Sequence, residues 1–248
     1  MEKGNIIIEI KEIRNQRLVQ KGEAHMIDKI IENNRVSIVG EIVSEFRYSH
    51  EVFGEGFYMV DVSVDRLSEL TDIIPLMVSE RLVDVTQDYT GRLVEVSGQF
   101  RSYNRHEGTR NKLVLSIFVR EWEEVEENLD AGRTNQIFLD GFICKPPIYR
   151  KTPLGREIAD LLIAVNRPYG KSDYIPCIAW GRNARYASAF EVGGHIQIWG
   201  RVQSREYIKK INFTVPDGIK NLFLFNNSSD EAFKKSLDEA VEYFKNLK

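Results

Sequence analysis

The chain has 248 residues, of which 42% are hydrophobic and 29% charged, and its formal net charge is −3. This length accommodates two domains of ordinary size, and the hydrophobic share is sufficient to give each a core. No apolar run reaches the roughly 18 residues of a transmembrane helix, and the N-terminal stretch carries acidic residues where a secretory signal is apolar, so we expect a cytoplasmic protein without a membrane partner.

Residues 1–32 are interpreted as an N-terminal extension, with a strand pattern at Ile6–Ile10 and a short helix pattern before Asn33. After it, alternating apolar residues and turn signals predict five strands, with a short helical or turn segment before the fourth. The predicted strands are 35–42, 57–64, 73–78, 93–100 and 113–119, and the helical or turn segment is 80–89. This order is typical of the OB fold, a small Greek-key barrel, so residues 33–125 are predicted to form a first OB domain.

The sequence then repeats itself at an offset of about one domain length. Ile74-Pro75 recurs as Ile175-Pro176, and Val64-Asp65-Arg66 recurs as Val165-Asn166-Arg167, both after 101 positions. Gly40 and Gly141 are also 101 positions apart, and Gly98 and Gly200 are 102 apart. Such a period is too long for a solenoid repeat and matches an independent domain. The sequence therefore predicts two tandem copies of one domain.

The second copy is predicted to occupy residues 133–226. The same patterns predict strands at 136–144, 158–167, 174–180 and 195–207, and a helix near 183–190. A fifth strand is missing from its expected place, because Pro216 and Gly218 favour a turn there. We expect residues 221–226 to supply that strand from a displaced position.

Residues 228–248 are predicted to form an amphipathic helix. Phe233, Leu237, Val241 and Phe244 recur at helical spacing, and Ser229 is suited to the N-cap. This apolar stripe either packs on its own domain or contacts a partner, and the sequence leaves both open. The predicted fold class is all-β with minor α, made of two tandem five-stranded OB barrels plus this C-terminal helix.

The sequence shows no constellation typical of catalysis or of a metal site. Its four histidines are scattered, it has no Gly-rich phosphate loop, and Cys144 and Cys177 lie in apolar runs typical of reduced core cysteines. Asp61 and Asp65 share one face of a predicted strand, where solvated carboxylates are commoner than a catalytic pair. We therefore predict a protein that is not an enzyme and has no metal or cofactor. Metal-dependent cleavage of a labelled strand would instead indicate a nuclease.

The two copies carry opposite charge. Residues 133–210 contain 13 basic and 6 acidic residues, whereas residues 33–124 contain 10 basic and 16 acidic residues. A basic domain on an otherwise acidic chain indicates a polyanionic partner for that domain.

The second copy also interleaves aromatic residues with the basic ones. The aromatic residues are Tyr169, Tyr174, Trp180 and Tyr207, and the basic residues are Arg167, Lys171, Arg182, Arg205, Lys209 and Lys210. Single-stranded nucleic acid is held by such a combination, because bases stack on aromatic rings while cations follow the backbone. Equally, an OB barrel has an aromatic-rich core and a surface on which arginines are solvated, and composition alone does not choose between the two.

At this point the sequence resembles a known family, the bacterial single-stranded DNA-binding proteins. The resemblance covers residues 136–210 and is carried by Thr152-Pro-Leu-Gly155, by the stretches 161–169 and 174–182, and by 192–207. Residues 33–210 as a whole resemble the two-OB form found in clostridia. The resemblance implies that Tyr169, Tyr174, Trp180 and Tyr207 stack the bases. It also implies that the protein coats and protects single-stranded DNA in replication, repair or recombination, at the nucleoid.

The equivalent positions of the first copy lack these aromatic residues, being Ser68, Ile73, Ser79 and Arg105. We therefore expect the first domain to bind DNA weakly or not at all and to serve assembly, although the basic loop 101–106 with Arg110 and Lys112 offers a local contact. Members of this family generally present four OB domains to DNA, so the resemblance implies a homodimer of this two-domain chain.

Two departures from the family pattern limit the resemblance. The acidic tail through which family members recruit replication and repair proteins is absent, since the sequence finishes Glu242-Tyr-Phe-Lys-Asn-Leu-Lys248. The sequence after Lys210 also no longer follows the family's last strand. An alternative is a non-catalytic assembly module similar to the primosomal OB proteins. Replacing Tyr174 and Trp180 would leave the function of such a module intact.

Overall fold

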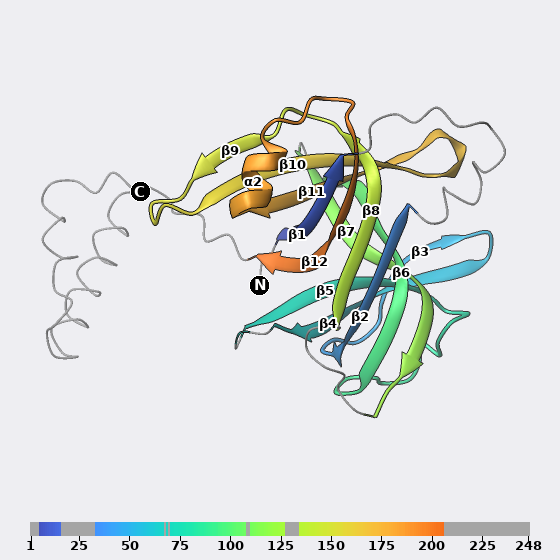
Figure 1. Ribbon diagram of the computed structural model, residues 1–248. Helices are drawn as coiled ribbons and strands as arrows, with labels where there is room; N and C mark the ends of the chain where they lie inside the picture. Colours follow the sequence, from blue (N-terminus) through green and yellow to red (C-terminus); the bar gives the residue numbers. More distant parts are fainter. Residues whose placement is uncertain are drawn as a thin grey trace, which may run out of the picture. The chain divides into compact units, whose positions relative to one another are not determined.

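A computed structural model of the chain describes residues 5–15, 33–66, 68, 70–107, 110–126 and 134–205. The described residues contain two barrels of β-strands, which Figure 1 labels in chain order. The strands up to residue 124 are β1 (Asn5–Asn15), β2 (Asn34–Ile42), β3 (Arg47–Val52), β4 (Glu55–Asp65), β5 (Thr71–Ser79), β6 (Leu93–Glu107) and β7 (Arg110–Glu124). The later elements are β8 (Asn135–Ile143), β9 (Ile148–Lys151), β10 (Glu157–Asn166), the 3-10 turn η2 (Pro168–Gly170), β11 (Ser172–Trp180), the helix α2 (Gly181–Ala187) and β12 (His195–Arg205).

The first barrel is closed by five strands in the order β4-β5-β7-β6-β2, with a further pairing between β2 and β4. Strands β5 and β7 run parallel, and the short strand β3 forms a hairpin with β4 outside the barrel. Between β5 and β6 the chain forms turns. Asp84 and Asp88 each accept a hydrogen bond from the backbone N–H two residues on, at Thr86 and Thr90, and such Asx turns compete with helix formation.

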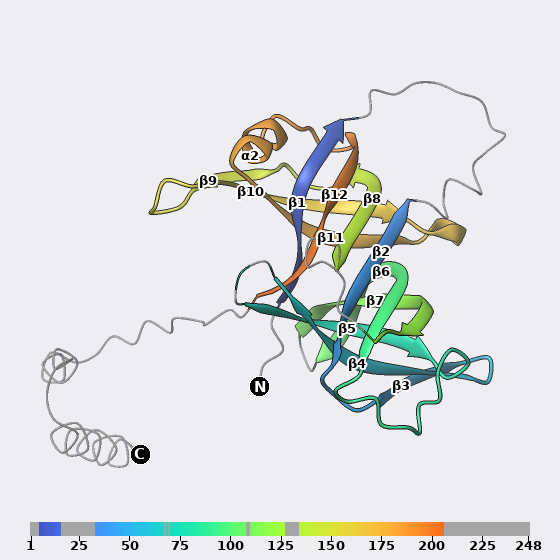
Figure 2. The same cartoon turned by 60° about the horizontal axis from the view of Figure 1, so that its bottom comes forward.

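The second barrel takes its fifth strand from the N-terminus of the chain. Its order is β8-β12-β1-β11-β10, closed by pairing of β8 with β10. Strand β1 lies between β11, to which it is parallel, and β12, to which it is antiparallel (Figure 2). In the first barrel β7 has the same two relationships, parallel to β5 and antiparallel to β6. Strand β1 therefore occupies in the second barrel the place that β7 occupies in the first.

The repeated glycines mark the points where these strands approach most closely. A Cβ atom added to Gly98 would clash with the carbonyl oxygen of Phe118 on β7, and one added to Gly200 would clash with the carbonyl oxygen of Glu9 on β1. Each glycine lies at a register shift of its strand pair, where a bulge bends the strand. The equivalence of Phe118 and Glu9 as neighbours of equivalent glycines supports the equivalence of β7 and β1.

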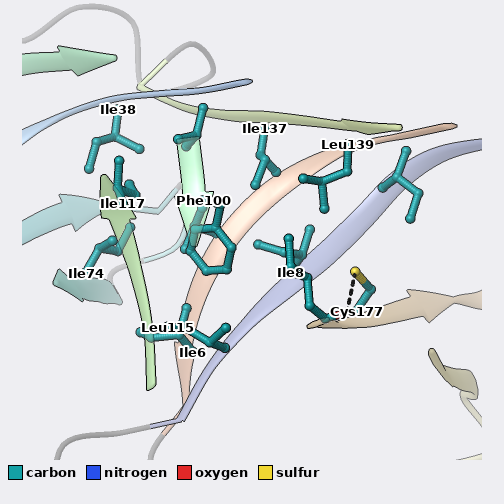
Figure 3. Packing of buried hydrophobic residues seen from close by; sticks show 14 of the residues in the cluster. Ile6, Ile8, Ile38, Ile74, Phe100, Leu115, Ile117, Ile137, Leu139 and Cys177 are labelled. Carbon is teal, nitrogen blue, oxygen red and sulfur yellow. Dashed lines mark hydrogen bonds between the residues drawn. The ribbon is translucent and has the colours of Figure 1, made fainter. Parts of the chain in front are cut away.

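The two barrels are joined through β2 and β8, which are equivalent strands of the repeat. Strand β2 pairs with β8 antiparallel, from Asn34 opposite Leu139 to Ile38 opposite Asn135. Because Asn34 and Asn135 are repeat equivalents, as are Ile38 and Leu139, the register is that of a local two-fold axis. The buried side chains form one cluster that includes Ile38, Phe100, Leu139 and Ile8 (Figure 3).

The predicted fold class, with two tandem OB barrels, is confirmed. The strand proposed at 221–226 and the amphipathic helix at 228–248 lie outside the described residues. The predicted helix near 183–190 corresponds to α2. Residues 80–89, predicted as either a short helix or turns, form turns. No helix within the described ranges has the length and apolarity needed to cross a membrane.

Candidate nucleic-acid interface

The candidate interface lies on the outer surface of the second barrel, where β10 and β11 pair. Tyr174 lies opposite Ala164 on β10, Pro176 opposite Leu162, and Trp180 opposite Ile158. Directly opposed residues of an antiparallel pair share a face, and along β11 every second residue shares it too. The residues of these two strands that share this side are called the β10–β11 face below, namely Ile158, Asp160, Leu162, Ala164, Tyr174, Pro176, Ile178 and Trp180.

The β10–β11 face is largely apolar and is open to solvent mainly at its Tyr174 end. Tyr174 is 50% exposed, and Leu162, Ala164, Pro176 and Trp180 are partly exposed, whereas Ile158 and Ile178 beside Trp180 are buried. The alternate residues Ile175, Cys177 and Ala179 are buried in the barrel. Tyr174 and Trp180 are six residues apart, about 20 Å along the strand. Aromatic rings at both ends of a partly exposed sheet surface offer the stacking positions that single-stranded nucleic acid requires.

Basic residues surround this face. Lys171 precedes β11, Arg182 lies in the first turn of α2, and both are exposed. The helix α2 follows Trp180 directly, and Gly181 allows this turn by adopting a φ of 53°. Lys171 and Arg182 therefore lie near opposite ends of β11, next to Tyr174 and Trp180 respectively.

Arg167, which the sequence predicts to bind DNA, lies at the contact between the two barrels. It is partly buried, and its guanidinium contacts both carboxylate oxygens of Asp173 and donates a 2.9 Å hydrogen bond to the carbonyl oxygen of Ser102 in the first barrel. The contact between the barrels therefore engages the Arg167 guanidinium in this structure.

Five of the ten predicted site residues lack a described side chain. Tyr169 lies in η2 and Arg205 ends β12, but their side-chain positions are outside the described structure. Tyr207, Lys209 and Lys210 lie wholly outside the described residues. The described part of the predicted site thus consists of the two aromatic residues on the face, the two exposed cations and Arg167.

Sequence reasoning missed the contribution of β9. This short strand pairs with β10, so that Ile148 lies opposite Asp160 and Arg150 opposite Ile158, on the same side as the β10–β11 face. Ile148 is 64% exposed, and Arg150 forms an ion pair with Asp160 at 2.9 Å. Its pattern in Ile148-Tyr-Arg-Lys151 is too short for periodicity to reveal a strand.

The equivalent surface of the first barrel has no such aromatic residues. Ile73 stands in the place of Tyr174 and is 43% exposed, and Ser79 stands in the place of Trp180 and hydrogen-bonds to Glu55. The carboxylate of Glu55 also forms an ion pair with Arg81. The ring opposite Ser79, that of Phe57, is buried, and the cation at this end, Arg81, is compensated by Glu55.

The described residues contain no group of three or more His, Cys, Asp or Glu side chains arranged to hold a metal ion. Burial raises the pKa of the Cys177 thiol, and Cys144, also with a raised pKa, is partly buried. Both thiols thus have the character of core cysteines rather than of activated nucleophiles.

The chain has relatives among known proteins. The model of the single-strand binding protein family matches residues 134–215. Single-stranded DNA-binding protein 3 of Listeria innocua serovar 6a is 35% identical over 80 residues, which cover 29% of this chain and 50% of the relative. Single-stranded DNA-binding protein B of Bacillus subtilis is 31% identical over 80 residues, covering 29% of this chain and 71% of the relative.

The fold has a relative among solved structures. The crystal structure of the single-stranded DNA-binding protein from Thermus aquaticus superposes with a TM-score of 0.58 at 20% identity, covering 69% of this chain and 88% of that chain. This likeness concerns the fold. The chain spans about half the length of the first curated relatives that it matches.

Proposed function

Because this chain belongs to the bacterial single-stranded DNA-binding protein family, we propose that it binds single-stranded DNA without reading the base sequence. Bases stack on Tyr174 and Trp180, while Lys171 and Arg182 hold the phosphates. The observation that carries this proposal is the β10–β11 face, which presents the partly exposed rings of Tyr174 and Trp180 and is flanked by cations. Such binding would protect exposed strands during replication, repair or recombination.

The proposal extends to residues whose side chains are not described. These are Tyr169, Tyr207, Arg205, Lys209 and Lys210. Strand β12 ends at Arg205, which pairs with Asn5 at the start of β1. We assign Tyr207 and the two lysines to the DNA path on the strength of the family resemblance.

The first barrel is proposed to act mainly in assembly. In its counterpart of the β10–β11 face, Ile73 and Ser79 stand in the places of Tyr174 and Trp180. Buried ion pairs and the pairing of β2 with β8 join it to the second barrel. We further propose that two chains associate, so that four OB barrels face the DNA. Light scattering after size-exclusion chromatography tests this association, because a mass of one chain would refute it.

The test of DNA binding is a titration of fluorescein-labelled oligo-dT, followed by anisotropy at two salt concentrations. Each stacked base contributes about 1 to 3 kcal/mol, so Tyr174→Ala/Trp180→Ala should weaken binding on the order of 100-fold. Affinity should also fall with salt, because phosphate contacts release counterions. Phe53→Ala is the control, since this ring is fully exposed in the β3–β4 turn of the first barrel.

Each outcome decides between the candidate functions. Tight, salt-sensitive binding that the double variant loses and Phe53→Ala keeps would support the β10–β11 face as the interface. Equal affinities of the wild type and the double variant would show that the DNA binds elsewhere on the protein. No binding by the wild type would refute the proposal and favour the assembly module.

A further inference from the structure

Ser102 of the first barrel is joined to the Tyr174 end of the β10–β11 face by three hydrogen bonds. Its hydroxyl accepts a 2.8 Å hydrogen bond from the backbone N–H of Tyr174. Its own backbone N–H donates to the carboxylate of Asp173 at 2.6 Å, and its carbonyl oxygen accepts a 2.9 Å hydrogen bond from the Arg167 guanidinium. Ser102 is buried, so these bonds are shielded from water.

The hydroxyl of Ser102 occupies a place that a neighbouring strand would otherwise fill. Within the described residues, β1 pairs with β11 from Cys177 to Ala179, so the Tyr174 end of this edge lies outside that pairing. A backbone N–H at such an open edge of a sheet is otherwise left to water. Ser102 supplies an acceptor from the first barrel and thereby holds the backbone at the start of β11.

The position of the Tyr174 ring depends on this backbone. The ring is half exposed, and within the described residues no side chain hydrogen-bonds to it or packs on it as an aromatic partner. The place of the ring therefore follows from the backbone at the start of β11. A stacking ring binds a base more tightly when it is already held in place, because less conformational entropy is lost on binding.

The second barrel holds the first barrel in the same way. Ser204 is the repeat equivalent of Ser102, and its hydroxyl accepts a 3.0 Å hydrogen bond from the backbone N–H of Ile73. Its own backbone N–H donates to Asp72 at 2.7 Å, and its carbonyl oxygen accepts a 3.0 Å hydrogen bond from Arg66. The two serines thus make the same three bonds, but Ser204 holds an aliphatic residue in place of an aromatic one. Ser204 is therefore a matched control within the same chain.

We propose that Ser102 is a positioning residue for DNA binding, which fixes the backbone of Tyr174 and so presents its ring to a base. This inference rests on the proposed function and deepens it, because the first barrel takes part in binding through a hydroxyl that does not contact the DNA. Loss of that hydroxyl reduces the affinity through Tyr174 and leaves the stacking position at Trp180 unchanged.

Ser102→Ala tests this role, with Ser204→Ala as the matched control. The affinity of each full-length variant for fluorescein-labelled oligo-dT is measured by anisotropy, and unfolding in urea shows whether each variant is folded. Ser102→Ala should weaken binding about fivefold, as expected for the loss of one hydrogen bond, and Ser204→Ala should leave the affinity unchanged. Ser102→Thr keeps the hydroxyl and should restore most of the affinity.

A double-mutant cycle separates positioning from a general loss of stability. In a Tyr174→Ala background Ser102→Ala should have no further effect on affinity, whereas in a Trp180→Ala background its effect should remain. A loss of affinity in Ser102→Ala that persists undiminished without the Tyr174 ring would overturn the proposal, and so would equal affinities of Ser102→Ala and Ser204→Ala. No binding by the wild type, or no effect of Tyr174→Ala alone, would instead refute the proposed function.

Hydrogen exchange provides a measurement that does not depend on DNA. In the wild type the backbone amide of Tyr174 should exchange slowly, because Ser102 accepts its hydrogen bond. Ser102→Ala should accelerate exchange at Tyr174 and leave Ile73 unchanged, and Ser204→Ala should do the reverse. If Ser102→Ala does not fold, the wild type still decides, because a Tyr174 amide that exchanges as fast as one in an open loop would overturn the proposal.

Discussion

Asp72 of the first barrel and Asp173 of the second are repeat equivalents, and each is fully buried between one arginine of its own barrel and one of the other. Asp72 contacts Arg66 and Arg201, and Asp173 contacts Arg167 and Arg101. Each carboxylate also accepts a backbone hydrogen bond from the facing barrel, at Ser204 and at Ser102. The two barrels of one chain therefore meet as two identical subunits would, through a reciprocal pair of contacts.

Asp72→Asn and Asp173→Asn should each destabilise the protein by about 3 to 5 kcal/mol, because each leaves two partly buried guanidinium groups without their carboxylate. Unfolding in urea, followed by circular dichroism, measures the effect. Asp160→Asn is the control, since its pair with Arg150 is largely exposed and should contribute less than about 1 kcal/mol. If only one of the two buried substitutions lowers the free energy of unfolding by more than the control does, the two contacts are not equivalent.

Gly200→Ala should loosen β1 from the second barrel, because a Cβ there clashes with the backbone of Glu9. Cys177 on β11 lies opposite Ile8 of β1 and is buried (Figure 3), so loosening β1 exposes its thiol. The rate of labelling by a thiol reagent should rise about tenfold, as expected for roughly 1.4 kcal/mol of easier opening. Gly98→Ala clashes with β7 in the first barrel and should leave this rate nearly unchanged. Faster labelling in Gly98→Ala than in Gly200→Ala would contradict the placement of β1.

Cys177 should make the protein less stable in alkaline solution. Burial raises the pKa of this thiol in the folded state, whereas in the unfolded chain a thiol ionises near about 8.5. Above that pH the thiol loses its proton in the unfolded state and keeps it in the folded state. The contribution of Cys177 to the free energy of unfolding is therefore fully present below that pH and is lost as the pH rises above it. The free energy of unfolding of the wild type should fall relative to Cys177→Ala by up to about 1.4 kcal/mol per pH unit. Parallel pH profiles for the two proteins would show that the thiol is not protected.

The repeat made the two barrels and most of the candidate face predictable from sequence. The common offset fixed equivalent strands, and alternation along 174–180 placed Tyr174 and Trp180 on one face. The fifth strand of the second barrel escaped prediction, because Ile6–Ile10 pairs with strands more than 160 residues away and no local pattern records such a pairing.

The contact of Arg167 with the first barrel also could not be predicted from the neighbouring sequence. Its neighbours in sequence resemble a DNA-binding stretch, and only the packing of the two barrels brings it against Ser102. Contacts between domains of this kind carry no periodicity, so sequence patterns do not predict them.

The most direct test of the β10–β11 face is the quenching of tryptophan fluorescence by oligo-dT. The chain has three tryptophans, Trp122, Trp180 and Trp199, and of these only Trp180 lies on the face. Saturating oligo-dT should quench the wild type, Trp122→Phe and Trp199→Phe, because a base stacks on Trp180. In Trp180→Phe most of the quenching should disappear. Undiminished quenching in Trp180→Phe, with DNA still bound, would show that the bases stack elsewhere.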